Sequence, residues 1–322
     1  MHVNFEDVAG YSREIGSAGE HRGGFMRSRR QFLTGSGLGV VALASGALTR
    51  TARAYASGKH PGIQLYTIND AMKADPRGAL KQLREIGYVE VESAGFGSLS
   101  GQQFRGLLDE AGLTCPSAHL QFDLANLHRA FDDGHTLGAK FAVASMMRSF
   151  VPNAPRDGLK SGMSLDEAAR TADLANHIGE SARRAGLQFT YHNHNFEFVD
   201  QGGGQIGYDV LLKETDPKLV KFEIDCGWMI FAGRDPIAYF HKYPQRFPMI
   251  HVKDFLPREN SATDMQGAEL GHGTVDYKPI FAAAVKAGLQ HYFVEQEGPF
   301  ARMSTIEAAR VDCEYLRSIG RA

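Results

Sequence analysis

From Gly62 onward, short runs rich in β-branched and aromatic residues alternate with longer stretches in which apolar residues recur at helical spacing. Short apolar runs bounded by polar or glycine-rich segments are typical of buried strands, and apolar positions three and four residues apart are typical of helices packed on a sheet. The pattern predicts eight strands, at residues 62–67, 88–93, 113–120, 140–145, 187–194, 220–225, 248–254 and 291–297.

The ends of the predicted helices carry recognisable signals. Four glycines stand directly before a predicted strand: Gly87, Gly112, Gly186 and Gly288. A glycine at that place adopts the left-handed conformation that ends a helix and turns the chain back into the sheet. Ser164 is the predicted N-cap of a long helix that runs to about Arg184. The Asp75-Pro76 and Asp235-Pro236 pairs predict two further helix starts with proline at the first helical position.

Strict alternation of strands and helices requires a parallel sheet with right-handed crossovers. Eight such units in about 265 residues favour closure into an α/β fold of the (β/α)8 TIM barrel type over an open doubly wound sheet. We therefore predict one barrel domain over residues 57–322. No GxGxxG motif follows the first predicted strand, and Gly202-Gly203-Gly204 stands in a predicted loop, so dinucleotide binding is not indicated.

Residues 1–56 differ in composition from the predicted barrel, and their pattern indicates an N-terminal leader. A basic segment that starts at Met26 is followed by a glycine-diluted apolar run ending near Leu48, which is short for a membrane span of about 20 residues. The segment Ser28–Leu33 (SRRQFL) resembles the twin-arginine export motif, and small residues precede a cleavage site after Ala56. The resemblance implies a signal peptide read by the twin-arginine translocase, a periplasmic or secreted protein, and loading of any metal before export.

Two alternatives to this interpretation of the leader stay open. The arginine pair can be a chance feature of an N-terminal anchor helix. Met26 is also a natural first residue, so that residues 1–25 would precede the true start of the chain.

Composition and charge argue against several classes of protein and of function. Apolar residues make up 43% of the 322 residues and charged residues 22%, which is ordinary globular usage and argues against disorder and against a polytopic membrane protein. The leader holds seven arginines and four acids, so the barrel carries 28 basic and 33 acidic residues. A mildly acidic barrel is not expected to bind nucleic acid. Cys115, Cys226 and Cys313 lack paired spacing and are expected to be buried small apolar residues.

Ionisable side chains gather at the carboxyl ends of the predicted strands, where TIM barrels hold their active sites. Residues two apart on a strand share a facing, so His192 with His194, and Glu223 with Asp225, are each expected to point into the barrel mouth. Clustered carboxylates repel one another unless a cation lies between them. The set His192, Asp225, His251 and Glu295 therefore predicts one divalent metal ion, Mn²⁺, Co²⁺, Mg²⁺ or Zn²⁺.

Other ionisable residues have simpler interpretations. Glu90 is open to a structural role in which it pairs with a Lys or Arg of a neighbouring strand. His241 and His291 are expected to lie on the surface.

Four motifs together carry a resemblance to a known family. YHNHNFEF, FEID followed by Trp228, HVKD and VEQE, in this order and spacing, are similar to the xylose-isomerase-like TIM barrels, the sugar phosphate isomerase/epimerase superfamily. In that family one divalent metal is held by an acid from strand five, Asp from strand six, His from strand seven and Glu from strand eight. Asp225, His251 and Glu295 match this pattern, whereas His192 stands where the strand-five acid is expected.

The departure at strand five leaves two arrangements open. Either His192 binds the metal while His194 or Glu197 moves protons, or Glu197 replaces the missing acid as fourth ligand. We assign His192 to the metal and expect Glu197, Glu295 or His194 to act as the base. His119, Lys253 and Glu297 are expected to bind substrate hydroxyls, and Trp228, with Phe96 and Phe300, to wall the pocket.

The resemblance implies proton abstraction beside the carbonyl of a sugar or keto-sugar, through an enediolate stabilised by the metal. If the proton returns to the substrate, the enzyme is an epimerase or isomerase, and this is the activity that we expect. If the substrate instead loses a β-substituent, the enzyme is a lyase or dehydratase that acts on 3-keto-glycosides or inososes. An apurinic endonuclease of this fold would need a cationic groove, and an exported sugar-binding protein without catalysis would not need metal ligands. Whether the barrel is a monomer or a homo-oligomer is left open.

Overall fold

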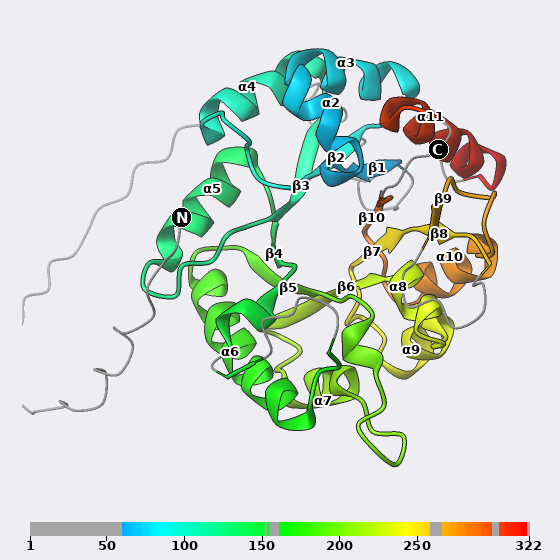
Figure 1. Ribbon diagram of the computed structural model, residues 1–322. Coiled ribbons are helices and arrows are strands. Elements are labelled where there is room, and N and C mark those ends of the chain that lie inside the picture. Colours follow the sequence, from blue (N-terminus) through cyan, green and yellow to red (C-terminus); the bar gives the residue numbers. More distant parts are fainter. Residues whose placement is uncertain (1–59, 152, 155–160, 258–265, 298–302, 321–322) are drawn as a thin grey trace, which may run out of the picture. The chain divides into compact units, whose positions relative to one another are not determined.

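The computed structural model describes residues 60–320 apart from 152, 155–160, 258–265 and 298–302 (Figure 1). The predicted leader and Phe300 lie outside the described residues, so the export signal stays a prediction. Among the helices of the described residues, none is long and apolar enough to cross a membrane.

Eight parallel strands close into a barrel, in the order β1-β10-β7-β6-β5-β4-β3-β2. Their bounds are β1 Gly62–Gln64, β2 Glu90–Ser93, β3 Thr114–His119, β4 Phe141–Ala144, β5 Gln188–His192, β6 Val220–Asp225, β7 Met249–Val252 and β10 His291–Val294. A separate antiparallel pair, β8 (Asp254–Phe255) and β9 (Gly267–Ala268), follows β7. The predicted (β/α)8 barrel is confirmed, and each predicted strand overlaps an observed one.

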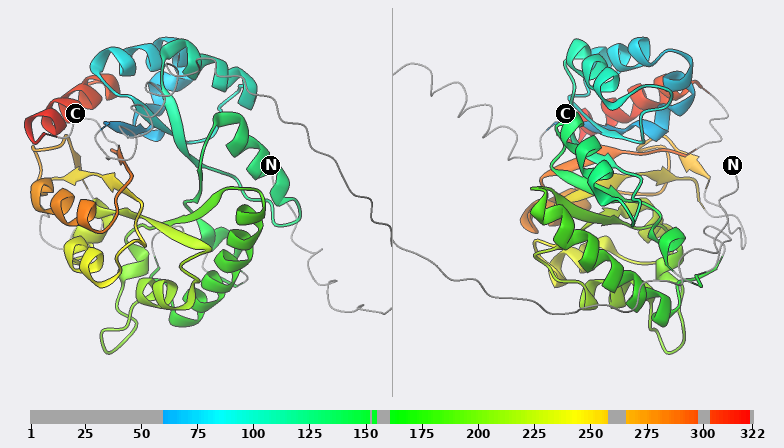
Figure 2. Two further views of the ribbon diagram at one scale, coloured as in Figure 1. Left: turned by 180° about the vertical axis from the view of Figure 1, so that it is seen from behind. Right: turned by 90° about the vertical axis from the view of Figure 1, so that its left-hand side faces the viewer.

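Helices form a ring around these strands (Figures 1 and 2). They are α2 Asn69–Ala74, α3 Pro76–Ile86, α4 Gly101–Ala111, α5 Leu127–Leu137, α6 Leu165–Arg184, α7 Gly207–Glu214, α8 Cys226–Phe231, α9 Pro236–Lys242, α10 Tyr277–Lys286 and α11 Thr305–Ser318. Three 3₁₀ turns complete the described framework: η1 Leu65–Ile68, η2 Met147–Phe150 and η3 Phe196–Phe198.

The predicted helix signals act as expected. The Ser164 side chain accepts a hydrogen bond from the Glu167 N–H at the start of α6, and Asp75 and Asp235 cap helices that have proline in the first turn. Gly112 ends α4 in the left-handed conformation, with φ of 69°. β6 has its predicted bounds, and the other seven strands are shorter than predicted. β1 ends where the chain turns into η1 after Gln64, and β7 ends before Lys253 and the β8–β9 pair.

The barrel interior is apolar at its centre and polar at both ends. Phe141, Val143, Met249 and Phe293 pack together inside the barrel. The three cysteines are buried and unpaired, as predicted.

Near the amino ends of the strands, His291 Nδ1 lies 2.8 Å from Glu90 Oε2. The surface prediction for His291 is therefore wrong, because its side chain is buried and takes the place beside Glu90 that the sequence assigned to a Lys or Arg. His241 is exposed, as predicted.

Candidate metal and proton-transfer site

Four predicted ligands meet at the carboxyl ends of four adjacent strands. His192 ends β5, Asp225 ends β6, His251 lies on β7 and Glu295 directly follows β10. One ligand atom from each of these residues lies within 4.8 Å of the others, and all four side chains are buried. We call His192, Asp225, His251 and Glu295 the outer set.

The end of β6 holds the Asp225 carboxylate in a fixed orientation. Asp225 is the N-cap of α8, and its Oδ1 accepts a hydrogen bond of 2.8 Å from the Trp228 N–H. Asn193 ties this point to β5, because its Oδ1 accepts a 3.1 Å hydrogen bond from the Asp225 N–H. Asp225 Oδ2 is left buried, without a hydrogen bond among the described residues. One carboxylate oxygen is thus used for structure, and the other, which lies 3.1 Å from Lys253 Nζ, is the one left to bind a metal ion.

His251 lies between two layers of carboxylates. Its Nδ1 is 3.1 Å from Glu295 Oε2, and its Nε2 is 2.7 Å from Glu92 Oε2. Glu92 is itself held by Gln64 Nε2 at 2.9 Å and by the Ser117 hydroxyl. A carboxylate behind a histidine fixes the ring and its tautomer, which is the usual arrangement around metal-binding histidines.

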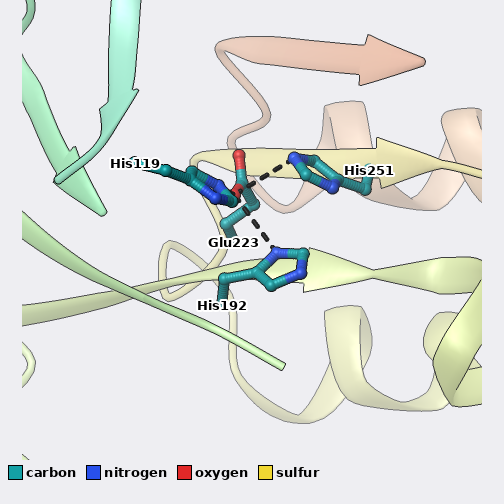
Figure 3. Close-up of side chains that lie close together, drawn as sticks. All are labelled: His119, His192, Glu223 and His251. Atoms are coloured by element: carbon teal, nitrogen blue, oxygen red, sulfur yellow. Dashed lines mark hydrogen bonds and ion pairs between the residues drawn. The ribbon is translucent and has the colours of Figure 1, made fainter. Parts of the chain in front are cut away.

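A second cluster is centred on Glu223, and we call it the inner set: His119, His192, Glu223 and His251 (Figure 3). Glu223 is two residues before Asp225 on β6 and shares its facing. Its Oε2 lies 3.1 Å from His119 Nε2, 3.3 Å from His192 Nδ1 and 3.2 Å from His251 Nε2. The two sets share His192 and His251, so the inner set supports the side chains of the outer set.

Lys253 supplies a buried positive charge beside the outer set. Its Nζ lies 3.1 Å from Asp225 Oδ2, 2.8 Å from Glu295 Oε2 and 2.7 Å from Glu297 Oε1. The ammonium also lies 5.0 Å from the centre of the Trp228 ring. α8 approaches Lys253 so closely that a Cβ at Gly227 would lie 2.7 Å from the Lys253 Cβ, and this contact requires glycine.

The charges in the site compensate one another. Burial alone would raise the pKa of Glu92, but the neighbouring His119 and His251 imidazoles outweigh it and hold the pKa below its ordinary value. Burial would lower the pKa of His119, and its contacts with Glu92 and Glu223 instead raise it to about 10. Burial, followed by the Lys253 charge, lowers the pKa of His194 to about 3, so this imidazole is neutral.

A polar cavity of about 330 Å³ opens onto this site. Its walls include His119, His192, His194, Glu295 and Glu297, and also Gln64, Tyr66 and Gln121. The cavity therefore holds acceptors and donors suited to a hydroxylated molecule of the size of one sugar ring. Five of the sequence-predicted site residues line it, whereas Trp228 is buried and its Nε1 donates a 3.2 Å hydrogen bond to Glu297 Oε1.

The structure places Glu197 elsewhere than the sequence predicts. After β5 the chain turns into η3, which directs Glu197 into the protein interior. Its Oε1 accepts a 2.8 Å hydrogen bond from the Tyr191 hydroxyl, and its Oε2 accepts one of 3.0 Å from the His194 N–H. Glu197 belongs neither to the outer set nor to the walls of the polar cavity, so it joins His194 to the end of β5 instead of facing a substrate.

The HVKD motif contains a residue with a structural role. The Asp254 carboxylate accepts hydrogen bonds from five backbone N–H groups, those of Phe255, Gly271, Gly273, Thr274 and Val275. This cradle fixes the segment after β9 against the end of β7. Asp254 thereby helps to hold Lys253, the residue before it, in place.

Glu92 and Glu223 had no assigned role in the sequence analysis, although both stand at strand ends. The available signal was the shared facing of Glu223 with Asp225, which puts the Glu223 carboxylate on the barrel interior. Contact between Glu92 and His251 joins strands β2 and β7, and sequence spacing carries no information on such a pair.

The donor set fits a divalent metal ion. Asp225 Oδ2 and His192 Nδ1 are buried and form no hydrogen bond of good geometry among the described residues, whereas buried polar atoms usually form one. Their nearest charged contacts are Lys253 Nζ, 3.1 Å from Asp225 Oδ2, and Glu223 Oε2, 3.3 Å from His192 Nδ1. Two imidazoles and two carboxylates from four strands are a common ligand combination for Mn²⁺, Co²⁺ and Zn²⁺.

Comparisons with known proteins agree with this geometry. Residues 80–319 match the family model described as xylose isomerase-like TIM barrel. A curated relative, an inosose dehydratase of Lacticaseibacillus casei, is 30% identical over 200 residues, which are 56% of this chain and 65% of that protein. The chain thus spans less than two thirds of the length of that relative.

Solved structures share the fold. A sugar phosphate isomerase/epimerase from Parabacteroides distasonis has a TM-score of 0.65 and 26% identity, with 81% of this chain and 94% of that chain covered. A xylose isomerase-like TIM barrel protein from Mycobacterium smegmatis, solved in complex with magnesium, has a TM-score of 0.55 and 18% identity, with 78% and 90% covered.

Proposed function

The chain belongs to the xylose isomerase-like TIM barrel family, and from this premise we propose that it is a divalent-metal-dependent enzyme that removes a proton beside the carbonyl of a sugar-like polyhydroxy ketone. We further propose that the reaction goes on to lose a β-substituent, as in a dehydratase or lyase. Isomerisation or epimerisation is the second candidate.

The outer set carries this proposal. Buried carboxylates and imidazoles from four adjacent strands converge at one point, at the floor of a polar cavity of about 330 Å³. His192, Asp225, His251 and Glu295 would hold the metal. A bound divalent cation would act as a Lewis acid and stabilise the negative charge that builds up on the carbonyl oxygen.

Two side chains of the cavity are placed to accept the substrate proton. Glu295 lines the cavity and is held by Lys253 Nζ, and the neutral imidazole of His194 also lines it. His119 lines the same cavity and would donate a proton or a hydrogen bond to the oxygen that leaves. An acceptor and a donor in one cavity are what β-elimination requires.

The residue on strand five favours elimination over epimerisation. Epimerisation needs a second proton carrier on the opposite side of the reacting carbon. In the ketose 3-epimerases of the family that the chain resembles, the strand-five acid has this role together with the strand-eight acid. Here His192 occupies the position, with its Nδ1 3.3 Å from Glu223 Oε2. The inosose dehydratase relative supports the same choice, because its name describes loss of water.

The isomerase or epimerase candidate rests on a different observation. The Parabacteroides distasonis structure that bears this description has almost its whole chain, 94%, covered by this fold. Both candidates begin with the same proton abstraction, so they differ only in the fate of the substrate after that step.

One experiment separates these outcomes. The purified protein is assayed for metal content and incubated in D₂O with a panel of inososes and keto-sugars; NMR follows deuterium incorporation and ultraviolet absorbance follows the conjugated enone formed by loss of water. We expect both signals with the protein and neither with Asp225→Ala, whereas exposed Glu314→Gln serves as the matched control. Deuterium incorporation without enone would assign an epimerase or isomerase. A metal-bearing protein that shows neither signal across the panel would contradict the proposed enzyme and favour a sugar-binding protein.

A further inference from the structure

A second cavity, of about 580 Å³, lies beside the polar one and has a different character. Its walls come from η1, α2, the start of α3, the segment between β2 and α4, and α4 itself. Six apolar side chains line it: Leu65, Met72, Pro76, Phe96, Leu99 and Phe104. Its volume lies within the range of sites that bind small organic molecules, about 300–1,000 Å³.

The two cavities adjoin. Ala94 lines both, and from the end of β1 into η1 the residues alternate, since Gln64 and Tyr66 line the polar cavity and Leu65 lines the apolar one. Tyr66 is 53% exposed, and a large aromatic ring left in water beside a cavity is a feature of binding surfaces. Tyr66 lines the polar cavity and directly follows Leu65, which lines the apolar one.

We propose that the apolar cavity is a subsite for a flat, apolar substituent, such as an aryl group, attached to the keto-sugar that occupies the polar cavity. This rests on the proposed function, which it deepens by naming the substrate class: a sugar-like ring with an apolar attachment, instead of a free inosose or monosaccharide. Tyr66 and Ala94 form the passage between the two parts of the substrate.

The shapes and polarities of the cavities fit such a two-part molecule. The polar cavity has room for one hydroxylated ring, and its walls offer imidazoles, carboxylates and amides. The apolar cavity gains affinity by taking apolar surface out of water, and this gain is independent of hydrogen bonding. Asn69 and Lys73 are the more polar members of its wall, so an acceptor group on the substituent has partners there.

The test compares matched ligands on the metal-loaded full chain. Isothermal titration measures binding of para-nitrophenyl and methyl glycosides of the same sugars, over a panel of sugars. Burial of an aryl ring should make the para-nitrophenyl member bind about tenfold more tightly, or better. Ser98→Trp, at an exposed turn position that lines the apolar cavity, should abolish this preference and leave binding of the methyl glycosides unchanged. Ser318→Trp, at an exposed position outside both cavities, is the matched control.

The outcomes separate the two proposals. Equal affinity for aryl and methyl glycosides, or an aryl preference that survives Ser98→Trp, overturns the subsite and leaves the proposed function standing. Absence of binding by every glycoside, together with absence of deuterium exchange into keto-sugars, overturns both. Sedimentation velocity provides one further check: a dimer that Ser98→Trp disrupts would assign the cavity to a second copy of the chain and overturn the subsite.

Discussion

Replacement of Glu197 by Gln tests whether this residue supports the structure or carries substrate protons. Its carboxylate is fully buried and accepts hydrogen bonds from the Tyr191 hydroxyl and the His194 N–H. A glutamine has the same shape and can keep both contacts, because its carbonyl oxygen accepts from one group and the tyrosine hydroxyl can accept from its amide. The substitution therefore removes the charge with little change in packing.

The size of the expected change in stability follows from the pKa of Glu197. Burial raises the pKa of Glu197 to about 7 from its ordinary value of 4.5, against the opposing effect of its hydrogen bonds. An acid with a raised pKa stabilises the fold at low pH, and that stability is lost as the pH rises from the unfolded pKa through the folded one. One pKa unit corresponds to about 1.36 kcal/mol, so ionisation of Glu197 should cost the native protein about 3 kcal/mol between pH 4.5 and pH 8.

The assay is denaturant unfolding of the wild type and of Glu197→Gln at pH 4.5, 6 and 8. We expect the stability of the variant relative to the wild type to increase by about 3 kcal/mol over this range, with metal content unchanged and turnover within a few fold. A flat difference across the pH range would show that Glu197 does not titrate there. Loss of about 10²–10⁴-fold in turnover with metal retained would restore Glu197 as the general base, and loss of metal would make it a ligand.

Three further predictions concern the metal and the leader. Asp225→Ala should abolish stoichiometric metal binding and leave the circular dichroism spectrum unchanged; retained metal would remove Asp225 from the outer set. Glu92→Gln should weaken metal binding about 10–100-fold through loss of support for His251, in contrast to Glu90→Gln at the opposite end of the strands, and equal effects would contradict this role. We also propose twin-arginine export: changing Arg29-Arg30 to Lys should trap the precursor in the cytoplasm, whereas unchanged export and cleavage would point to another route.

The barrel was predictable because local sequence carries most of its determinants. Alternating apolar runs, glycines such as Gly112 at helix ends and the Ser164 cap each act over a few residues, and eight repeats of one unit leave few topologies. The outer set was predictable for the same reason, since strand ends in a parallel barrel meet at one edge. Asp225, His251 and Glu295 needed no knowledge of packing beyond this.

The remaining features depend on contacts between distant residues. Glu197 comes five residues after the end of β5, and only the turn into η3 decides that it points inward. His291 and Glu90 are 201 residues apart, and their pairing depends on the closure of β1 between β10 and β2. The apolar cavity likewise joins η1, α2 and the β2–α4 segment, whose side chains have no common periodicity in the sequence.

The imidazole at position 192 changes the charge of the site in a way that the neighbouring residues match. With His192 in place of an acid, the outer set carries two carboxylates, and Lys253 Nζ lies 3.1 Å from Asp225 Oδ2 and 2.8 Å from Glu295 Oε2. A third carboxylate at this point would lie beside Glu223, whose Oε2 is only 3.3 Å from His192 Nδ1, and repulsion between two buried carboxylates is costly. Deep in the barrel, Glu92 and Glu223 already have His119 between them as a compensating group, at 3.2 and 3.1 Å. The two inner carboxylates, Glu92 and Glu223, orient His251 and His119. An imidazole at position 192 suits this arrangement, because it adds no further negative charge beside Glu223.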